Sequence, residues 1–458
     1  MSRSEESIIS RSLPWYLSCP CPCFRRCASV PGLSGASLLP RYQALRGTRD
    51  ILPGEVEKWQ RVERIARALL DRYGFREIRT PIIEPTELFV RSVGGSTDIV
   101  RKEMFTLVLS EDSVSLRPEG TAPVVRAFVQ AGLDRVAGAD RLYYIGPMFR
   151  YERPQKGRQR QFHQIGVEVI GSDDPLVDAE TIEMLLYLLE ELGVSETSLA
   201  LNSVGDAVCR PGYREALRAY LAPRLALLCA DCNRRYEENP LRVFDCKVET
   251  CRGELAAAPA MLDHLCEDCR RHFDSVRSYL DRFGIEYMID PRLVRGLDYY
   301  VRTAFELLSE QLGAQNSLMG GGRYDGLVKE MGGKDLPGFG WALGLERLMM
   351  LLPADRAEAT APADILIAPL DAPARTAAAL AARTLRRAGV RVLLEAGERS
   401  LTSHLRRADR LGVPLVLIIG EQEVAAGGYT LRDMRSGEQR PVPVSELTRL
   451  AEEILREA

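Results

Sequence analysis

The chain has 458 residues, of which 46% are hydrophobic and 27% are charged, and its formal net charge is −3 at pH 7. This length allows two or three domains with sizeable cores, and the small net charge excludes a protein that binds nucleic acid through bulk positive charge. A nucleic-acid ligand would therefore need local basic patches. No uninterrupted apolar run approaches the ~20 residues needed to cross a bilayer, so we expect a soluble, cytoplasmic protein with no membrane partner.

Residues 1–45 differ in composition from the rest and are expected to be an N-terminal extension. They are rich in Ser and Arg, and no acidic residue lies between Ser7 and Arg49. Such composition is typical of organelle transit peptides, but we favour a disordered extension or residues added by an upstream start codon. The eleven cysteines of the chain do not imply disulfides, because large intracellular enzymes more often keep cysteines reduced or bound to metal.

From residue 46 the chain alternates between helical and strand patterns. The apolar residues of 55–73 recur with a helical period, and 75–83 is predicted to be one strand, with Pro81 favouring an edge or an interface. Further strands are expected at 113–117, 142–151, 162–170, 198–204, 301–308 and 336–340, and further helices at 122–131, 178–192 and 342–352. Residues 209–285 are mostly helical and are predicted to be an insertion.

The last hundred residues follow another pattern. Residues 353–362 are rich in Ala, Glu and Pro and are predicted to be a linker. Short apolar strands at 365–369, 390–394 and 415–419 then alternate with helices at 374–387 and 400–411. This alternation predicts an α/β domain over 363–458 with a largely parallel sheet.

Three separate parts of the chain carry arginines together with carboxylates and tyrosines. They are GPMFRYER (146–153) with QFHQIGVE (161–168), RGLDYY (295–300) and GFGWALGLER (338–347). Arginines on separate segments suit a site that neutralises a polyphosphate, because guanidinium pairs bidentately with phosphate oxygens and keeps its charge. The neighbouring carboxylates and tyrosines suit a small substrate that is polar, cationic or hydrogen-bonding.

Together with TPIIEP (80–85), LRPEGT (116–121) and GGGRYD (320–325), these runs resemble histidyl-tRNA synthetase, a class II aminoacyl-tRNA synthetase. The resemblance covers about residues 45–450. It implies an α+β fold, with a class II catalytic core at 46–352 built on an antiparallel sheet flanked by helices, and a C-terminal α/β anticodon-binding domain. It also implies a homodimeric histidine–tRNA ligase that uses ATP and Mg²⁺, forms histidyl-adenylate from L-histidine and transfers histidine to the 3′ end of tRNA(His).

The same resemblance assigns roles to single residues. Arg150 and Arg295 would contact the α-phosphate as catalytic residues, and Arg347 would lie by adenine and the γ-phosphate. Arg158 would reach the outer phosphates, with a surface salt bridge as the alternative, and Phe162 would stack on adenine. The residues expected to bind histidine are Glu119, Thr121, Gln164, Glu168, Tyr299, Tyr300 and Tyr324. Those expected to meet the tRNA acceptor end are Arg153, Gln155 and Lys156.

Several other residues have two interpretations. The glycines Gly338, Gly340 and Gly344 are expected to let a strand and a helix pack closely against the nucleotide. His163 is interpreted as structural, because no step of the reaction obviously requires it. In the C-terminal domain, an arginine cluster around one helix fits either tRNA contact or a solvated face; it consists of Arg399, Arg406, Arg407 and Arg410.

The cysteines of the insertion have zinc-ligand spacing. They form two CxxC pairs, Cys229 with Cys232 and Cys266 with Cys269. Two more cysteines, Cys246 and Cys251, lie between the pairs, which are farther apart than in the usual zinc ribbon. A structural zinc ion on Cys229, Cys232, Cys266 and Cys269 therefore stays open, and a catalytic zinc ion is not expected.

Two alternative functions remain at this stage. One is the regulatory subunit of ATP phosphoribosyltransferase, a non-catalytic relative that typically lacks the C-terminal domain and the catalytic residues. This chain keeps Arg150, Arg295, Arg347 and a full C-terminal region. The other is a different class II synthetase with the same type of anticodon domain, which the run RGLDYY argues against.

Overall fold

The computed structural model describes residues 42–457, with gaps at 96, 314–315, 354–360 and 398. The proposed N-terminal extension and most of the proposed linker therefore lie outside the described residues. Leu45–Ala458 form the larger of two units, and all elements named below belong to it. In the described part of the chain, no helix combines the length and the apolar character that a membrane span requires.

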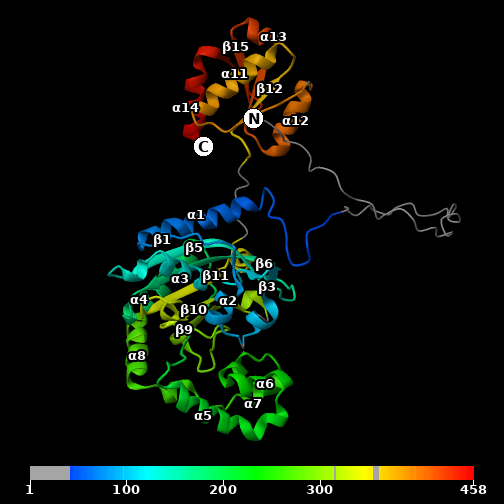
Figure 1. The fold of residues 1–458 in the computed structure, drawn as a ribbon. Coiled ribbons are helices and arrows are strands. Elements are labelled where there is room, and N and C mark those ends of the chain that lie inside the picture. Colours follow the sequence, from blue (N-terminus) through cyan, green and yellow to red (C-terminus); the bar gives the residue numbers. More distant parts are fainter. Residues whose placement is uncertain (1–41, 96, 314–315, 354–360, 398, 458) are drawn as a thin grey trace, which may run out of the picture. The chain divides into compact units, whose positions relative to one another are not determined.

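The region expected to be the catalytic core is built on an eight-stranded sheet with the order β1-β5-β6-β11-β10-β9-β7-β8 (Figure 1). The pairs at its two ends, β1 with β5 and β7 with β8, are parallel, and all the others are antiparallel. The predicted antiparallel sheet is thus confirmed. Its strands are β1 (Arg76–Glu77), β5 (Asp140–Phe149), β6 (Gln161–Ile170), β7 (Ser198–Ser203), β8 (Met288–Ile289), β9 (Val301–Leu308), β10 (Ser317–Arg323) and β11 (Gly338–Gly344).

The two faces of this sheet carry different side chains, because neighbouring residues of a strand point to opposite faces. On β6, Ile165, Val167 and Val169 enter the main hydrophobic core. That core also contains the buried faces of α1 (Val56–Arg72), α4 (Pro175–Glu191) and α8 (Glu267–Arg282). Gln164 and Glu168 alternate with these residues and belong to the opposite face. The alternation therefore places polar side chains of β6 on one face of a sheet whose other face is apolar.

A second small sheet, β2-β4-β3, precedes the central hairpin. It consists of β2 (Ile83–Pro85), β3 (Phe105–Leu109) and β4 (Asp112–Leu116), with α2 (Thr86–Phe89) next to it, and α3 (Thr121–Gln130) follows. The single strand predicted for 75–83 is wrong, because β1 pairs with β5 whereas β2 pairs with β4. Between them lies Pro81, which has no N–H to donate to a ladder. Strand β11 also continues to Gly344, so α10 (Leu345–Leu351) begins later than predicted.

The insertion is helical, as predicted, and has its own apolar cluster around Tyr213, Leu217, Leu221 and Val243. Its elements are α5 (Arg210–Leu221), α6 (Ala230–Glu238), α7 (Glu249–Glu254) and α8, with the 3₁₀ segments η4 (Ala222–Leu227), η5 (Pro240–Asp245) and η6 (Met261–His264). Figure 1 shows α5, α6 and α7 gathered together, and α8 packs against α4.

The C-terminal residues build a second sheet, with the order β13-β12-β14-β15-β16. Its first three strands are parallel, but β15 and β16 are antiparallel, so the expectation of a largely parallel sheet holds for only part of it. The strands are β12 (Ile365–Pro369), β13 (Val392–Leu394), β14 (Leu415–Ile419), β15 (Gly428–Asp433) and β16 (Gln439–Pro443). The helices are α11 (Ala374–Arg387), α12 (Leu401–Leu411), α13 (Glu421–Ala425) and α14 (Leu447–Glu457).

Candidate active site

A cavity of about 290 Å³ lies on the polar face of the catalytic sheet. Strands β6, β9, β10 and β11 contribute to its lining, as do the start of α3 and the run RGLDYY. The predicted site residues that line it are Glu119, Thr121, Arg150, Arg158, Phe162, Gln164, Arg295, Tyr299, Tyr300 and Arg347. Segments far apart in the sequence thus converge on one site.

Arg295 is held in this cavity by two strands of the sheet. Its guanidinium forms an ion pair with Glu306 of β9 and lies 5.9 Å from the centre of the Tyr300 ring. The Arg295 guanidinium also lies against Gly320 of β10. A Cβ atom at position 320 would lie 2.3 Å from Arg295 Cζ, so only glycine at this position leaves room for the guanidinium. Burial lowers the pKa of Arg295, but the charge of Glu306 more than offsets burial and raises it. Arg295 is therefore a fixed cation.

Arg150 and Arg347 reach the cavity from other segments. Arg150 Nε donates to the Pro118 carbonyl over 2.8 Å, and its guanidinium lies 5.3 Å from the centre of the Phe162 ring. Arg347 donates to the Ser317 carbonyl over 2.5 Å. Burial and the neighbouring charge of Arg158 lower the pKa of Arg347. Because these cations converge on one cavity, the site suits a ligand that carries several negative charges.

The basic loop between β5 and β6 divides into residues that face the cavity and residues that do not. Two backbone hydrogen bonds, of 2.9 and 3.1 Å, close a turn between Gln155 and Arg158, with Gly157 at φ +71°. Arg158 lines the cavity and pairs with Glu152 over 2.8 Å, so it combines both predicted roles, cavity residue and salt-bridge partner. In contrast, Arg153, Gln155 and Lys156 are exposed and do not line it.

Thr121, Tyr144 and Gln164 line the other end of the cavity, and the predicted residues Glu168 and Tyr324 contact lining residues without lining it themselves. Glu168 is fully buried, and its Oε1 accepts a 2.7 Å hydrogen bond from the Thr121 hydroxyl. Gln164 Oε1 and the Tyr144 hydroxyl are also buried, and the described residues offer them no hydrogen-bond partner, whereas the Tyr324 hydroxyl and the Glu168 carboxyl group interact with each other. Buried polar atoms in native proteins are almost always paired. This group therefore fits a ligand that supplies several hydrogen bonds.

Burial raises the pKa of Glu168 from its ordinary value of 4.5 to about 8, against the lowering effect of the Thr121 hydrogen bond. Between these two values the unfolded chain gives up a proton that the folded protein keeps, so rising pH destabilises the fold. We compare the free energy of unfolding of Glu168→Gln with that of wild type at two pH values. The variant should gain stability relative to wild type between pH 5 and pH 8.5, by on the order of a few kcal/mol. Urea-unfolding midpoints at both pH values measure this difference, with the exposed Glu190→Gln as control. If the difference in unfolding midpoint between Glu168→Gln and wild type were the same at both pH values, this prediction would be wrong.

Two glycines of β11 make room for this polar group. A Cβ atom at Gly340 would lie 2.1 Å from Glu168 Oε2, and one at Gly338 would lie 2.1 Å from the Tyr324 ring. The expectation that Gly338 and Gly340 pack against the nucleotide is therefore wrong, because the space that they leave is filled by Glu168 and Tyr324. Gly344, the third of these glycines, lines the cavity.

Glu119 lies at the start of α3. Its two carboxylate oxygens accept from the backbone N–H groups of Thr121 (2.8 Å) and Ala122 (3.0 Å), and the Tyr299 hydroxyl donates over 3.3 Å. Burial raises its pKa despite these hydrogen bonds. The carboxylate thus completes the helix N-terminus and lines the cavity at the same time.

Sequence reasoning missed several residues of the site. Tyr144 and Glu306 line the cavity, and Glu346 accepts from both the backbone N–H of His163 (2.9 Å) and its ring Nδ1 (2.9 Å). The contacts of His163 agree with its structural interpretation. Strands β9 and β5 have no regular polar alternation at these positions, so no local pattern points to Glu306 or Tyr144. Glu346 belongs to the run 338–347, but its contact with His163 joins residues 183 positions apart and has no local signal.

The insertion contributes Arg242, which holds the run that carries Arg295. Its Nη2 donates to Asp298 Oδ1 over 2.7 Å, and its Nη1 donates to the Arg295 carbonyl over 3.0 Å. Arg242 is buried, so these contacts are shielded from water. The insertion thus fixes the backbone from which a cavity arginine projects.

We expect Arg242→Ala to lower kcat by about 10- to 100-fold while the protein stays folded, because a misplaced catalytic group loses rate steeply. Steady-state kinetics of amino-acid activation measure the loss, and circular dichroism checks the fold. Arg252→Ala, an exposed arginine of α7, is the matched control and should behave as wild type. Equal kinetics for the two variants would show that Arg242 does not position Arg295.

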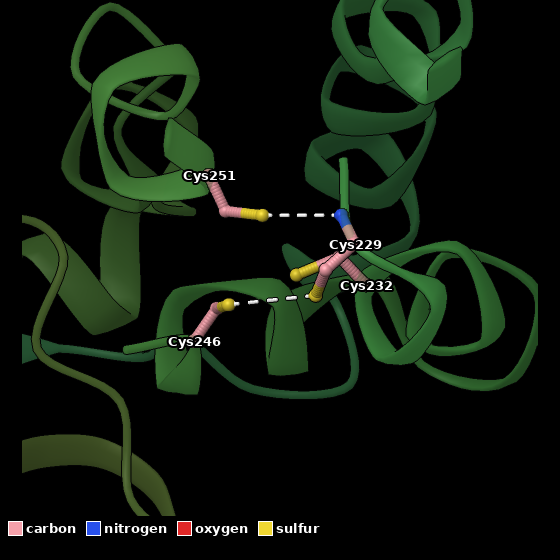
Figure 2. Close-up of side chains that lie close together, drawn as sticks. All are labelled: Cys229, Cys232, Cys246 and Cys251. Carbon is pink, nitrogen blue, oxygen red and sulfur yellow. Dashed lines mark hydrogen bonds between the residues drawn. The ribbon is translucent and has the colours of Figure 1, made fainter. Parts of the chain in front are cut away.

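The cysteines of the two CxxC pairs do not come together. Cys229 and Cys232 lie with Cys246 and Cys251, as Figure 2 shows. Cys266 and Cys269 lie instead with Asp206 and Cys209. The four ligands expected for a single zinc ion are therefore divided between two groups, because the cysteines between the pairs fold back onto the first pair.

Comparisons with known proteins cover most of the described chain. Residues 47–348 match the family described as Histidyl-tRNA synthetase, and residues 364–454 match the one described as Anticodon binding domain. A curated relative from Syntrophotalea carbinolica, named histidine–tRNA ligase, is 50% identical over 400 residues, which are 87% of this chain and 95% of the relative. One from Solibacter usitatus with the same name is 51% identical over 399 residues, with 87% and 95% covered. The crystal structure of apo histidyl-tRNA synthetase from S. aureus matches with a TM-score of 0.76 at 34% identity, over 90% of this chain and 100% of that chain.

Proposed function

The chain belongs to the histidyl-tRNA synthetase family, and we propose that the cavity on its catalytic sheet is where histidine is activated with ATP. The enzyme is an ATP-dependent histidine–tRNA ligase. The arrangement of charged and polar groups around the cavity supports placing the reaction in it. Cations from three separate segments lie beside buried polar atoms that lack partners among the described residues.

In the proposed activation step, a histidine carboxylate oxygen attacks the α-phosphorus of ATP. A new O–P bond forms, the bond to pyrophosphate breaks, and no proton has to be removed from the nucleophile. Arg150 and Arg295 would bind the α-phosphate oxygens, and Arg158 and Arg347 would bind the outer phosphates. Fixed cations lower the barrier by stabilising the charge that builds up in the transition state.

Histidine itself would occupy the buried polar end. Its α-ammonium needs acceptors, for which the cavity offers Glu119, Thr121 and Gln164, and its ring N–H would donate to Glu168. The rings of Tyr299, Tyr300 and Tyr324 would wall this end, with Tyr299 and Tyr300 only 4.7 Å apart between centres. A buried hydrogen-bonding pocket rejects apolar amino acids, because they would leave its polar groups unpaired.

Mg²⁺ would enter this site on the phosphates of ATP. The carboxylates that line the phosphate end already have partners: Glu152 pairs with Arg158, Glu306 with Arg295, and Glu346 with His163. Mg²⁺ commonly keeps several waters and binds mainly through substrate phosphates, so it does not need a dedicated protein cage. When bound, it would neutralise charge on the leaving pyrophosphate.

Transfer to tRNA(His) would use the exposed side of the basic loop and the C-terminal domain. Arg153, Gln155 and Lys156 are exposed beside the cavity residue Arg158, where they can meet the acceptor end. In the C-terminal domain, Arg399 and Arg407 pair with the buried Glu395. Arg406 and Arg410 are exposed, and we propose that they contact the anticodon arm of the tRNA. We place this reaction in the cytoplasm, where tRNA is charged.

We also propose that the enzyme is a homodimer joined through the segment that contains β2 and the neighbouring small sheet. Apolar side chains gather there on the surface: Ile82, Ile83, Leu107, Val108 and Leu109 are 40 to 74% exposed. An exposed apolar patch marks a contact surface. We further propose that the insertion binds structural zinc, which would not contact the reacting atoms.

Aminoacylation tests the proposed function directly. Purified protein, ATP, Mg²⁺, radiolabelled histidine and total bacterial tRNA should give acid-precipitable histidyl-tRNA. The regulatory-subunit alternative predicts a folded protein that neither activates histidine nor charges tRNA. The retained arginines and C-terminal domain argue against that outcome.

A further inference from the structure

The insertion carries two groups of metal-ligating side chains outside the active site. We infer that each binds one structural zinc ion. The first group is Cys229, Cys232, Cys246 and Cys251, and the second is Asp206, Cys209, Cys266 and Cys269. In each group, the four ligand atoms lie within 4.8 Å of one another.

The first group has the spacing of a tetrahedral thiolate site. Its four side chains point toward one another in Figure 2, and Cys229 Sγ lies 3.8 Å from Cys246 Sγ. A tetrahedron with zinc–sulfur distances of about 2.3 Å has sulfur–sulfur edges of about 3.8 Å. A disulfide would bring the two sulfur atoms to about 2.05 Å. The separation therefore matches ligands around a metal and not a cross-link.

The second group has three thiols and one carboxylate. Cys209 Sγ lies 3.8 Å from Cys266 Sγ and 3.7 Å from Cys269 Sγ. Asp206 Oδ1 lies 3.2 Å from Cys209 Sγ and 3.9 Å from Cys266 Sγ. A zinc ion with one oxygen ligand at about 2.0 Å and sulfur at about 2.3 Å requires oxygen–sulfur edges of about 3.5 Å, which lies between these values.

The same local structure supports both groups. Each CxxC pair begins at a helix N-cap, Cys229 for α6 and Cys266 for α8, so that its second cysteine lies in the first helical turn. Backbone N–H groups also donate to ligand sulfur atoms, from Cys229 to Cys251 over 3.2 Å and from Asp206 to Cys209 over 3.3 Å. Both features stabilise negative charge on the thiolates and orient the ligands.

The alternative is that these residues are reduced thiols that only fill the core of the insertion. Two observations argue against it. All cysteines of the described chain belong to one group or the other, so none is left over as simple packing. The helices that the first group joins are also short, with 9 residues in α6 and 6 in α7. Small units with little apolar core usually need a metal or disulfides to fold.

The two sites hold different parts of the insertion. The first joins α6, η5 and α7, and therefore fixes the segment that carries Arg242. The second joins the chain that leaves β7 to the start of α8, which leads back to the sheet. If the proposed function holds, loss of the first zinc ion would impair activation through the contact between Arg242 and Asp298.

Zinc content of the full chain tests the inference independently of activity. Thiol-protected protein analysed by plasma mass spectrometry should contain two zinc ions per chain. Cys251→Ser and Cys269→Ser should each lose one, and the double variant both. As control, replacing Cys19, Cys21, Cys23 and Cys27 together by serine should leave two. A wild type with one zinc ion or none, or single variants that keep both, would overturn the inference.

A measurement on wild type covers the case in which these variants do not fold. X-ray absorption at the zinc edge should show sulfur as the main ligand at about 2.3 Å, with on average one light ligand for every seven sulfurs. A shell made mostly of nitrogen or oxygen would rule out these ligand sets.

Discussion

Replacing Arg295 by alanine is expected to lower kcat for histidine-dependent ATP–pyrophosphate exchange by about 10³-fold or more, because removing one transition-state cation or donor typically costs about 10²- to 10⁵-fold. The side chain is fixed by Glu306 and by the space at Gly320, so its charge is held in one position in the cavity. The loss should appear in kcat much more than in the KM for histidine, since the charge that Arg295 stabilises is greatest in the transition state.

Arg292→Ala is the matched control for this variant. Arg292 is exposed, three residues earlier in the same segment, and does not line the cavity. It should keep wild-type exchange within about 2-fold, as surface changes usually do. If Arg295→Ala kept exchange close to that of Arg292→Ala, Arg295 would not be a catalytic residue.

Replacing Glu168 by glutamine is expected to raise the KM for histidine by about 10²- to 10⁴-fold, because hydrogen-bonding pockets that lose a partner discriminate on this scale. Glutamine keeps the shape of the side chain but cannot ionise, so it cannot supply the negative charge that would stabilise a bound ring N–H. The KM for ATP should stay within about 3-fold, because the arginine end of the cavity is unchanged.

Steady-state exchange at varied histidine and varied ATP separates the two effects. Glu190→Gln, an exposed carboxamide substitution on α4, controls for the loss of one negative charge and should leave both KM values unchanged. Equal increases in both KM values for Glu168→Gln would instead indicate general disruption of the site, and the placement of the histidine ring at Glu168 would be wrong.

Much of the fold could be predicted from local patterns. The helices at α1, α4 and α11 follow from apolar periodicity, because each buries one regular face, and the hairpin of β5 and β6 follows from two strand-forming runs joined by a short basic loop. Prediction failed where pairing depends on distant residues. Strand β10 is rich in glycine and has no alternating pattern, and the helix expected from residue 342 starts later because β11 pairs with β6 as far as Gly344.

The site was predictable only in part for the same reason. Motifs carried by single segments identified the arginines, but Glu306 and Arg242 act through contacts with residues 11 and 53 positions away from them. No local spacing reveals such pairs. The cysteines show the same limit, since CxxC spacing identifies a pair of ligands but does not determine which other residues complete the site.

The most direct test of the central claim is ATP–pyrophosphate exchange by the wild-type protein with each of the twenty amino acids in turn. Exchange with histidine, and at least 10²-fold less with every other amino acid, is the expected result, because the buried polar end of the cavity leaves unpaired groups with any other side chain. Exchange with a different amino acid, or no exchange from a folded protein, would contradict the assignment of this cavity to histidine activation.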